Sequence, residues 1–158
     1  MNTHADSQVR RATTADVPVL ATLRFDFRSR NKPAVESAAD FLPRCTEWMR
    51  PRIADAGTWR VWVLEHDGAI VGNIWLEVVE KLPNPNVERE LHGYVTNFFV
   101  LPEHRNAGAG SRLLQAVLDE CRRSEVDSVF LWPSERSRPL YERFGFVPPS
   151  EMLVLARR

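Results

Sequence analysis

The spacing of apolar side chains in the first third of the chain is that of two helices. In the first, apolar residues recur every three or four positions: Val17, Leu20, Leu23 and Phe27. Thr13 and Asp16 precede them at the spacing of an N-terminal cap. A second helix is predicted over residues 38–54, with one apolar side: Phe41, Cys45, Trp48, Met49 and Ile53. Pro43 can lie in its first turn, whereas Pro51 should kink or split it.

Alternating and β-branched segments predict strands in the rest of the chain. Residues 59–65 place Trp59, Val61 and Val63 on one face and Arg60, Trp62 and Leu64 on the other. The Asp-Gly turn at residues 67–68 then leads into a strand over 69–80. Further strands are expected at 9–12, 91–101, 126–132 and 152–156, and helices from Gly108 onward and over 134–143.

This order of elements predicts an α/β fold. The antiparallel start followed by a β-α-β crossover gives a mixed, mostly antiparallel sheet with helices on both faces. No linker or repeat divides the chain, so we expect a single domain spanning residues 1–158.

Composition and charge exclude some kinds of partner and site. The 158 residues are 44% hydrophobic and 27% charged, and 21 basic residues balance 21 acidic ones. A net charge of zero argues against a nucleic-acid or membrane-surface partner bound by bulk charge. No secretory signal and no apolar stretch of about 20 residues is present, so we expect a cytoplasmic protein. Cys45 and Cys121, like His92 and His104, lack the spacing of a metal site, so no metal is expected.

The segment with the clearest chemistry runs from Phe98 to Leu114. It reads as a strand, a tight loop and a helix start, and Arg105, Gly108 and Gly110 form the pattern R-x-x-G-x-G. The first amides of a helix lack internal partners and carry the positive end of its dipole, so a phosphate fits there. Gly108 and Gly110 could instead only cap a turn, but the strand, Pro102 and Arg105 favour the binding loop. The loop lacks the lysine of a Walker A motif and the third glycine of a dinucleotide fingerprint.

This segment resembles the acetyl-CoA-binding motif of the GNAT superfamily of N-acetyltransferases. Residues 140–146, Leu-Tyr-Glu-Arg-Phe-Gly-Phe, are similar to the family's tyrosine-bearing helix and Gly-Phe turn. The resemblance is specific over about residues 95–146. It implies a GNAT-like fold and acetyl-CoA as cosubstrate.

The resemblance also implies roles for individual residues. Backbone groups of Phe98, Phe99 and Val100 would bind the pantetheine arm, in a cleft where the strands carrying Val100 and Val129 splay apart. Tyr141 would protonate the departing thiolate, and Ser134 stands where the family often has a cofactor-binding Asn. The pyrophosphate would lie on the backbone amides of the loop and first turn: Arg105, Asn106, Ala107, Gly108, Ala109, Gly110 and Ser111.

The acceptor side departs from the family. Tyr94 stands where several members have a glutamate base; a base elsewhere, or a water chain to Glu77, Glu90 or His92, could replace it, and the sequence does not choose between them. The resemblance places acceptor contacts near Phe25 and Asp26, at the end of the first helix, with Tyr94 as a further candidate.

Two functions follow from these residues. The leading one is transfer of an acetyl group from acetyl-CoA to a primary amine by direct attack in a ternary complex. The amine can belong to a small molecule or a polypeptide, and the family resemblance is compatible with a homodimer. The alternative is a non-catalytic acyl-CoA-binding sensor or interaction module, which Tyr94 and Ser134 would suit.

Overall fold

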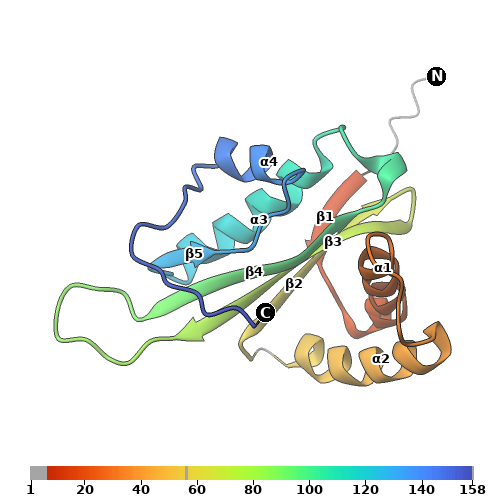
Figure 1. The fold of residues 1–158 in the computed structure, drawn as a ribbon, viewed down its shortest axis with the longest axis horizontal. Coiled ribbons are helices and arrows are strands. Elements are labelled where there is room, and N and C mark those ends of the chain that lie inside the picture. Colours follow the sequence, from red (N-terminus) through yellow and green to blue (C-terminus); the bar gives the residue numbers. More distant parts are fainter. Residues whose placement is uncertain (1–6, 56, 158) are drawn as a thin grey trace.

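The computed structural model describes residues 7–55 and 57–157 and shows one twisted sheet between helical layers (Figure 1). The helices are α1 (Val17–Ser29), α2 (Ala38–Ala54), α3 (Ala109–Arg123) and α4 (Arg138–Arg143). The strands are β1 (Ser7–Arg11), β2 (Trp59–His66), β3 (Ala69–Glu80), β4 (Leu91–Val100) and β5 (Ser128–Phe130). Short 3₁₀ turns at Thr14–Asp16 and Pro102–His104 precede α1 and the α3 loop.

The strands lie side by side in chain order, β1-β2-β3-β4-β5. The first three pairings are antiparallel and the last, between β4 and β5, is parallel across the α3 crossover. Asp67 and Gly68 have φ of 50° and 78°, the left-handed conformation that a two-residue hairpin turn requires. The predicted α/β fold with a mixed, mostly antiparallel sheet is therefore confirmed.

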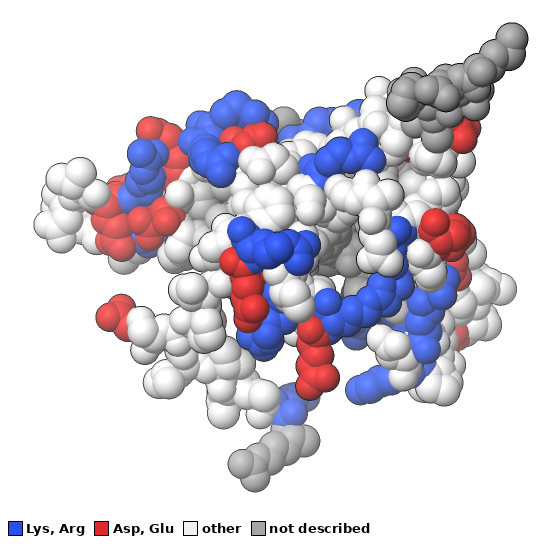
Figure 2. Space-filling view, turned by 90° about the horizontal axis from the view of Figure 1, so that it is seen from above, with Lys and Arg blue, Asp and Glu red and all other residues white. Residues whose placement is uncertain are grey.

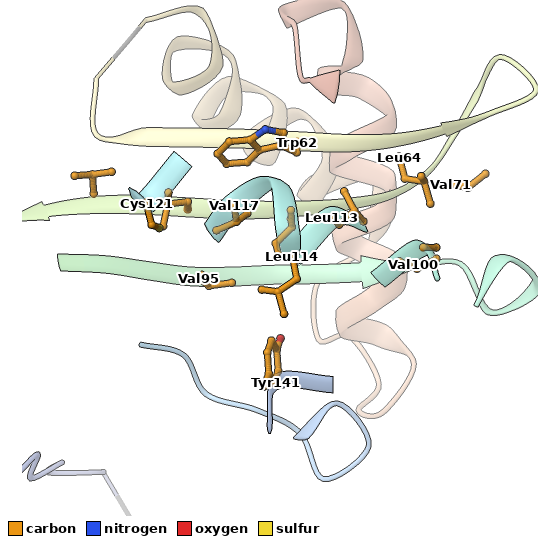
Figure 3. Packing of buried hydrophobic residues seen from close by; sticks show 14 residues of the cluster. Trp62, Leu64, Val71, Val95, Val100, Leu113, Leu114, Val117, Cys121 and Tyr141 are labelled. Carbon is orange, nitrogen blue, oxygen red and sulfur yellow. The ribbon is translucent and has the colours of Figure 1, made fainter. Parts of the chain in front are cut away.

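Each face of the sheet has its own hydrophobic core. On one face, Val61, Val63 and Trp75 pack against α1 and α2. On the other, Trp62 and Leu64 pack with Leu113, Leu114 and Val117 of α3 (Figure 3). The alternation predicted for residues 59–64 is confirmed, because successive side chains of a strand point to opposite faces.

Helix α2 corrects one expectation. It begins after Ser37, whose hydroxyl accepts a hydrogen bond from the Asp40 amide, and it continues to Ala54. Pro51 was expected to kink or split it, and it does not split it: the helix runs unbroken through Pro43 and Pro51. Pro51 lies in the last turn, where little helix remains to be disrupted, and the Asp55 amide still donates to its carbonyl.

The C-terminal part of the chain corrects two more expectations about secondary structure. The predicted strand over 152–156 is wrong: this segment is irregular, and Leu153 and Leu155 are fully exposed. An apolar run forms a strand only when a neighbouring strand pairs with it, and among the described residues none pairs with this one. The strand expected over 126–132 is shorter, and within 134–143 only the α4 residues are helical.

Both cysteines are free thiols in the interior. Cys45 lies on the buried side of α2, and Cys121 lies on the buried stripe of α3, as expected of a core position. In the described part of the chain, no helix is long and apolar enough to span a membrane. Across those same residues, no three His, Cys, Asp or Glu side chains gather as a metal site would require.

Candidate functional site

The loop before α3 presents a row of free backbone amides. From Asn106 to Ser111, no amide donates a hydrogen bond to any atom of residues 7–55 and 57–157. Asn106 and Gly108 have φ of 66° and 75°, and these left-handed residues turn the chain into the helix, which begins at Ala109. The amides and the positive end of the α3 dipole together suit a bound anion.

Three arginines lie beside this loop without a carboxylate partner among the described residues. The guanidinium groups of Arg105 and Arg30 lie 5.4 and 5.6 Å from the ring centre of Phe99. Burial lowers the pKa of Arg105, and the positive charges of Arg136 and Arg30 lower it further, partly offset by Glu103. Figure 2, seen from the top of Figure 1, shows many Lys and Arg side chains around a hollow on this face. A bound anion would relieve this repulsion.

Strands β4 and β5 separate close to the loop. They pair only where His92, Gly93 and Tyr94 oppose residues 128–130, so from Val95 onward the β5-facing edge of β4 has no strand partner among the residues that the structure describes. Phe98, Phe99 and Val100 lie on this unpaired edge, and the Val100 carbonyl accepts a 2.7 Å hydrogen bond from Arg105 Nε. The divergence expected between the strands of Val100 and Val129 agrees with this pairing.

Tyr141 lies on α4, across from β4. Its ring is buried between Phe98 and Phe146, with centroid separations of 6.1 and 5.6 Å, and in Figure 3 its hydroxyl points toward β4 and α3. Burial raises the pKa of Tyr141 to about 12, against a smaller opposing effect of Ser137. The hydroxyl therefore keeps its proton at neutral pH and is available as a donor.

Gly110 and Ser134 have local structural roles as well. A Cβ on Gly110 would lie 3.3 Å from Leu140 and 3.4 Å from Phe98, so this glycine lets α3 approach α4 and β4 closely. The Ser134 and Ser137 hydroxyls are 2.9 Å apart, and each accepts a hydrogen bond from the other residue's amide. Ser134 thus caps the turn before α4, in addition to the cofactor contact predicted for it.

A cavity of about 680 Å³ lies on the other face of β4, between that strand and α2. Its walls carry five aromatic side chains: Phe41, Trp48, Trp59, Trp75 and Tyr94. This volume is typical of small-molecule sites. Of the three acceptor residues predicted from the sequence, only Tyr94 lines it.

The other predicted residues lie nearby or elsewhere. Phe25 packs against Phe41 with ring centres 5.6 Å apart, and neither Phe25 nor Asp26 belongs to the cavity wall; Arg24 does. The three groups considered as bases also lie outside the wall: Glu77, Glu90 and His92. The wall's one carboxylate among the described residues is Glu47, which is exposed. Sequence reasoning missed Arg24 because its only signal was its position beside Phe25.

Comparison with known proteins decides the family. The model of the acetyltransferase (GNAT) family matches residues 24–146, more than half of the chain. The chain belongs to the GNAT family. Its members transfer acyl groups from acetyl-CoA, so this protein is an acetyltransferase.

Several solved structures share the whole fold. A GCN5-related N-acetyltransferase from Ralstonia eutropha is 27% identical with a TM-score of 0.79, and the match covers 96% of this chain and 99% of that one. A predicted acetyltransferase from Clostridium acetobutylicum, whose structure contains acetyl-CoA, is 21% identical with the same TM-score and 96% coverage of both chains. An integron cassette protein from the Cole Harbour salt marsh is 26% identical with a TM-score of 0.76, and the match covers 96% of this chain and 90% of that protein.

A curated relative of this GNAT protein is much longer. The inositol hexakisphosphate and diphosphoinositol-pentakisphosphate kinase of Saccharomyces cerevisiae is 29% identical over 113 residues. The match covers 71% of this chain and 10% of the kinase. Because nine tenths of that protein lies outside the match, its kinase name carries no conclusion about this chain.

Proposed function

We propose that this acetyltransferase moves the acetyl group of acetyl-CoA to a primary amine by direct attack in a ternary complex. The observation that carries the proposal is the row of free amides from Asn106 to Ser111. They would bind the pyrophosphate with Arg105 beside them, and the open edge of β4 at residues 98–100 would bind the pantetheine arm. In the Clostridium acetobutylicum protein, which has the same fold, acetyl-CoA is present in the structure.

In this proposal Tyr141 is the acid that protonates the departing thiolate. The attacking nitrogen forms a C–N bond, the C–S bond breaks, and one proton must leave the nitrogen while the sulfur gains one. Tyr141 is buried beside β4 with its proton held by a pKa of about 12, so it can donate to the departing thiolate. The acceptor would enter from the aromatic cavity on the other face of β4, where Tyr94 forms part of the wall.

The test has two separate readouts. Calorimetric titration with acetyl-CoA measures the cofactor site, with Gly108→Val as the variant that should lose binding by blocking the left-handed turn. Release of free CoA in the presence of an amine panel measures transfer. Binding together with amine-dependent release supports the proposal, whereas binding with no release from any amine would favour the acyl-CoA-binding module. Absence of binding would overturn both.

A further inference from the structure

The aromatic cavity has an apolar floor and a basic wall. Three indole rings meet there, with Trp48, Trp59 and Trp75 centred 5.5 to 6.0 Å from one another. Trp75 is buried, whereas Trp48 is exposed and Trp59 is partly exposed, so a ligand ring would pack edge to face against Trp48 and Trp59. Such a floor favours an acceptor with a ring over a flexible aliphatic amine.

Three arginines line the cavity, and their charges are matched differently. Arg44 is bound through two nitrogens to the Glu36 carboxylate, so its charge is neutralised within the protein. Arg52 lies over the Trp48 ring at 3.9 Å and donates to the Trp48 carbonyl. Arg24 is partly buried and has no carboxylate within 4 Å in the part of the chain that the structure describes. Arg52 also lacks a carboxylate within 4 Å among those residues, but its guanidinium is held on the Trp48 ring and carbonyl, whereas Arg24 donates to the neutral side-chain amide of Asn97.

The hydrogen bonds around Arg24 leave an excess of donors. Its guanidinium donates to Asn97 Oδ1 at 3.2 Å, and Asn97 Nδ2 donates to Asn73 Oδ1 at 3.1 Å. Trp75 Nε1 donates to the same Asn73 oxygen at 2.9 Å. Arginine and indole can only donate, so the orientation of both amides is fixed.

This network ends in an unsatisfied group. Asn73 is fully buried, and its Nδ2 has no hydrogen-bond partner among the described residues. Burial lowers the pKa of Arg24, and the positive charge of Arg28 acts in the same direction. Asn73 is not part of the cavity wall, so a ligand in the cavity would meet Arg24 and Asn97, and one that brings negative charge would be stabilised beside Arg24.

We propose that the acceptor is a primary amine that carries both an aromatic ring and a carboxylate, held by Arg24 at the carboxylate and by Trp48 and Trp59 at the ring. The inference rests on the proposed function, since it names the substrate of the same site. Glu47, the exposed carboxylate of the wall, suits the amine end of such a ligand and would repel a second carboxylate.

Matched acceptor pairs test the inference in the unaltered protein. The probes are L-tryptophan against L-tryptophanamide, L-phenylalanine against L-phenylalaninamide, and 4-(aminomethyl)benzoate against its amide. Binding is measured by calorimetry on CoA-saturated protein, and kcat/KM by CoA release. The carboxylate of at least one pair should be preferred by about 10- to 100-fold, as a hydrogen bond to a charged group predicts.

Variants of Arg24 test whether this residue causes the preference for the carboxylate over the amide. Arg24→Gln removes the charge and should reduce the preference to about 3-fold or less, while Arg24→Lys should retain part of it. Arg50→Gln makes the same charge change on an exposed part of α2 outside the cavity wall and should leave the preference unchanged. Thermal unfolding of each variant shows whether it is folded.

The outcomes separate the inference from the function it rests on. Equal or better use of the neutral amides would overturn the inference while acetyl transfer stands. Failure of every probe to bind would also overturn it. Carboxylates that bind through Arg24 without being acetylated would support the ligand class and count against transfer. Absence of acetyl-CoA binding to the unaltered protein would overturn the proposed function and, with it, the inference.

Discussion

Replacing Tyr141 by Phe removes one oxygen from the centre of the candidate site. The ring lies in the core between Phe98 and Phe146, and phenylalanine keeps that packing. Tyr141 lies on α4, whereas the proposed pyrophosphate site is on the loop before α3. The substitution should therefore act on the chemical step and leave acetyl-CoA affinity within about 2-fold of the original.

The raised pKa of Tyr141 sets the loss of kcat that we expect for Tyr141→Phe. A pKa of about 12 is two units above the ordinary tyrosine value of about 10, so ionising Tyr141 costs about 3 kcal/mol more than ionising an exposed tyrosine. The pKa also exceeds that of a thiol, about 8.5, by more than three units, so complete transfer to free thiolate is uphill. Tyr141 is therefore a weak acid, and we expect a loss of about 100-fold in kcat, at the low end for acid catalysis.

The assay is CoA release at saturating substrates, with acetyl-CoA affinity measured separately by calorimetry. Phe146→Leu is the control, because it alters packing beside the ring and keeps the hydroxyl; its kcat should stay within about 3-fold. Because burial raises the pKa of Tyr141 above its unfolded value, the side chain is neutral in both states up to about pH 10. Above that pH the unfolded state ionises first, so the free energy of unfolding should fall as pH rises toward 12. Full activity of Tyr141→Phe would remove this residue from the mechanism.

Three further predictions concern the loop, the cap of α1 and a buried thiol. Gly108→Ala should lower the free energy of unfolding in urea by about 1–2 kcal/mol because φ is 75°, and Gly57→Ala, without a positive φ, is the control. Asp16→Asn should cost about 1–3 kcal/mol at pH 7, since the carboxylate binds Arg10 through both oxygens and accepts from the Thr13 amide. The pKa of Asp16 is lowered, chiefly by Arg10, so its stabilisation is present above about pH 4 and lost at lower pH; the variant should therefore lose less stability in acid. Burial raises the pKa of Cys121 to about 11, so alkylation at pH 8 should be slow until the protein unfolds, and rapid labelling of the native protein would contradict its burial.

Local patterns predicted most of the fold. The Asp-Gly dipeptide specifies left-handed residues at 67 and 68, and the structure has both. Helix α3 follows from its apolar stripe, and the loop before it follows from Gly108, which can adopt a positive φ without strain. Each of these features depends on residues that are close together in the sequence.

Features that depend on distant residues could not be predicted. Arg24 meets Asn97 across 73 positions of sequence, and the aromatic cavity needs α1, α2 and three strands together. The segment 152–156 has the pattern of a strand but no strand beside it, and sequence alone does not reveal whether a partner edge is free. Long-range pairing therefore decided the outcome for segment 152–156, whereas the error at Pro51 of α2 had a local cause.

A single extra residue in β4 links the two parts of the candidate site. Asn73 pairs with Phe99 and Trp75 with Thr96, so both Asn97 and Phe98 lie opposite Ile74, and Asn97 has φ of 49°. This is a β-bulge, which changes the face to which later side chains point.

The bulge explains how one strand serves both faces. Before it, Tyr94 and Thr96 line the aromatic cavity. In a regular strand Phe98 would share their face, since it is two residues beyond Thr96. The structure instead places Phe98 against Tyr141 and the α3 core, while Phe99 stacks on Phe27 of α1 at 5.0 Å. The bulge at Asn97 therefore turns Phe98 toward Tyr141, on the side where β4 and β5 separate, while the Asn97 side chain binds Arg24 in the aromatic cavity. The proposed acceptor and acetyl-CoA would meet at this bulge.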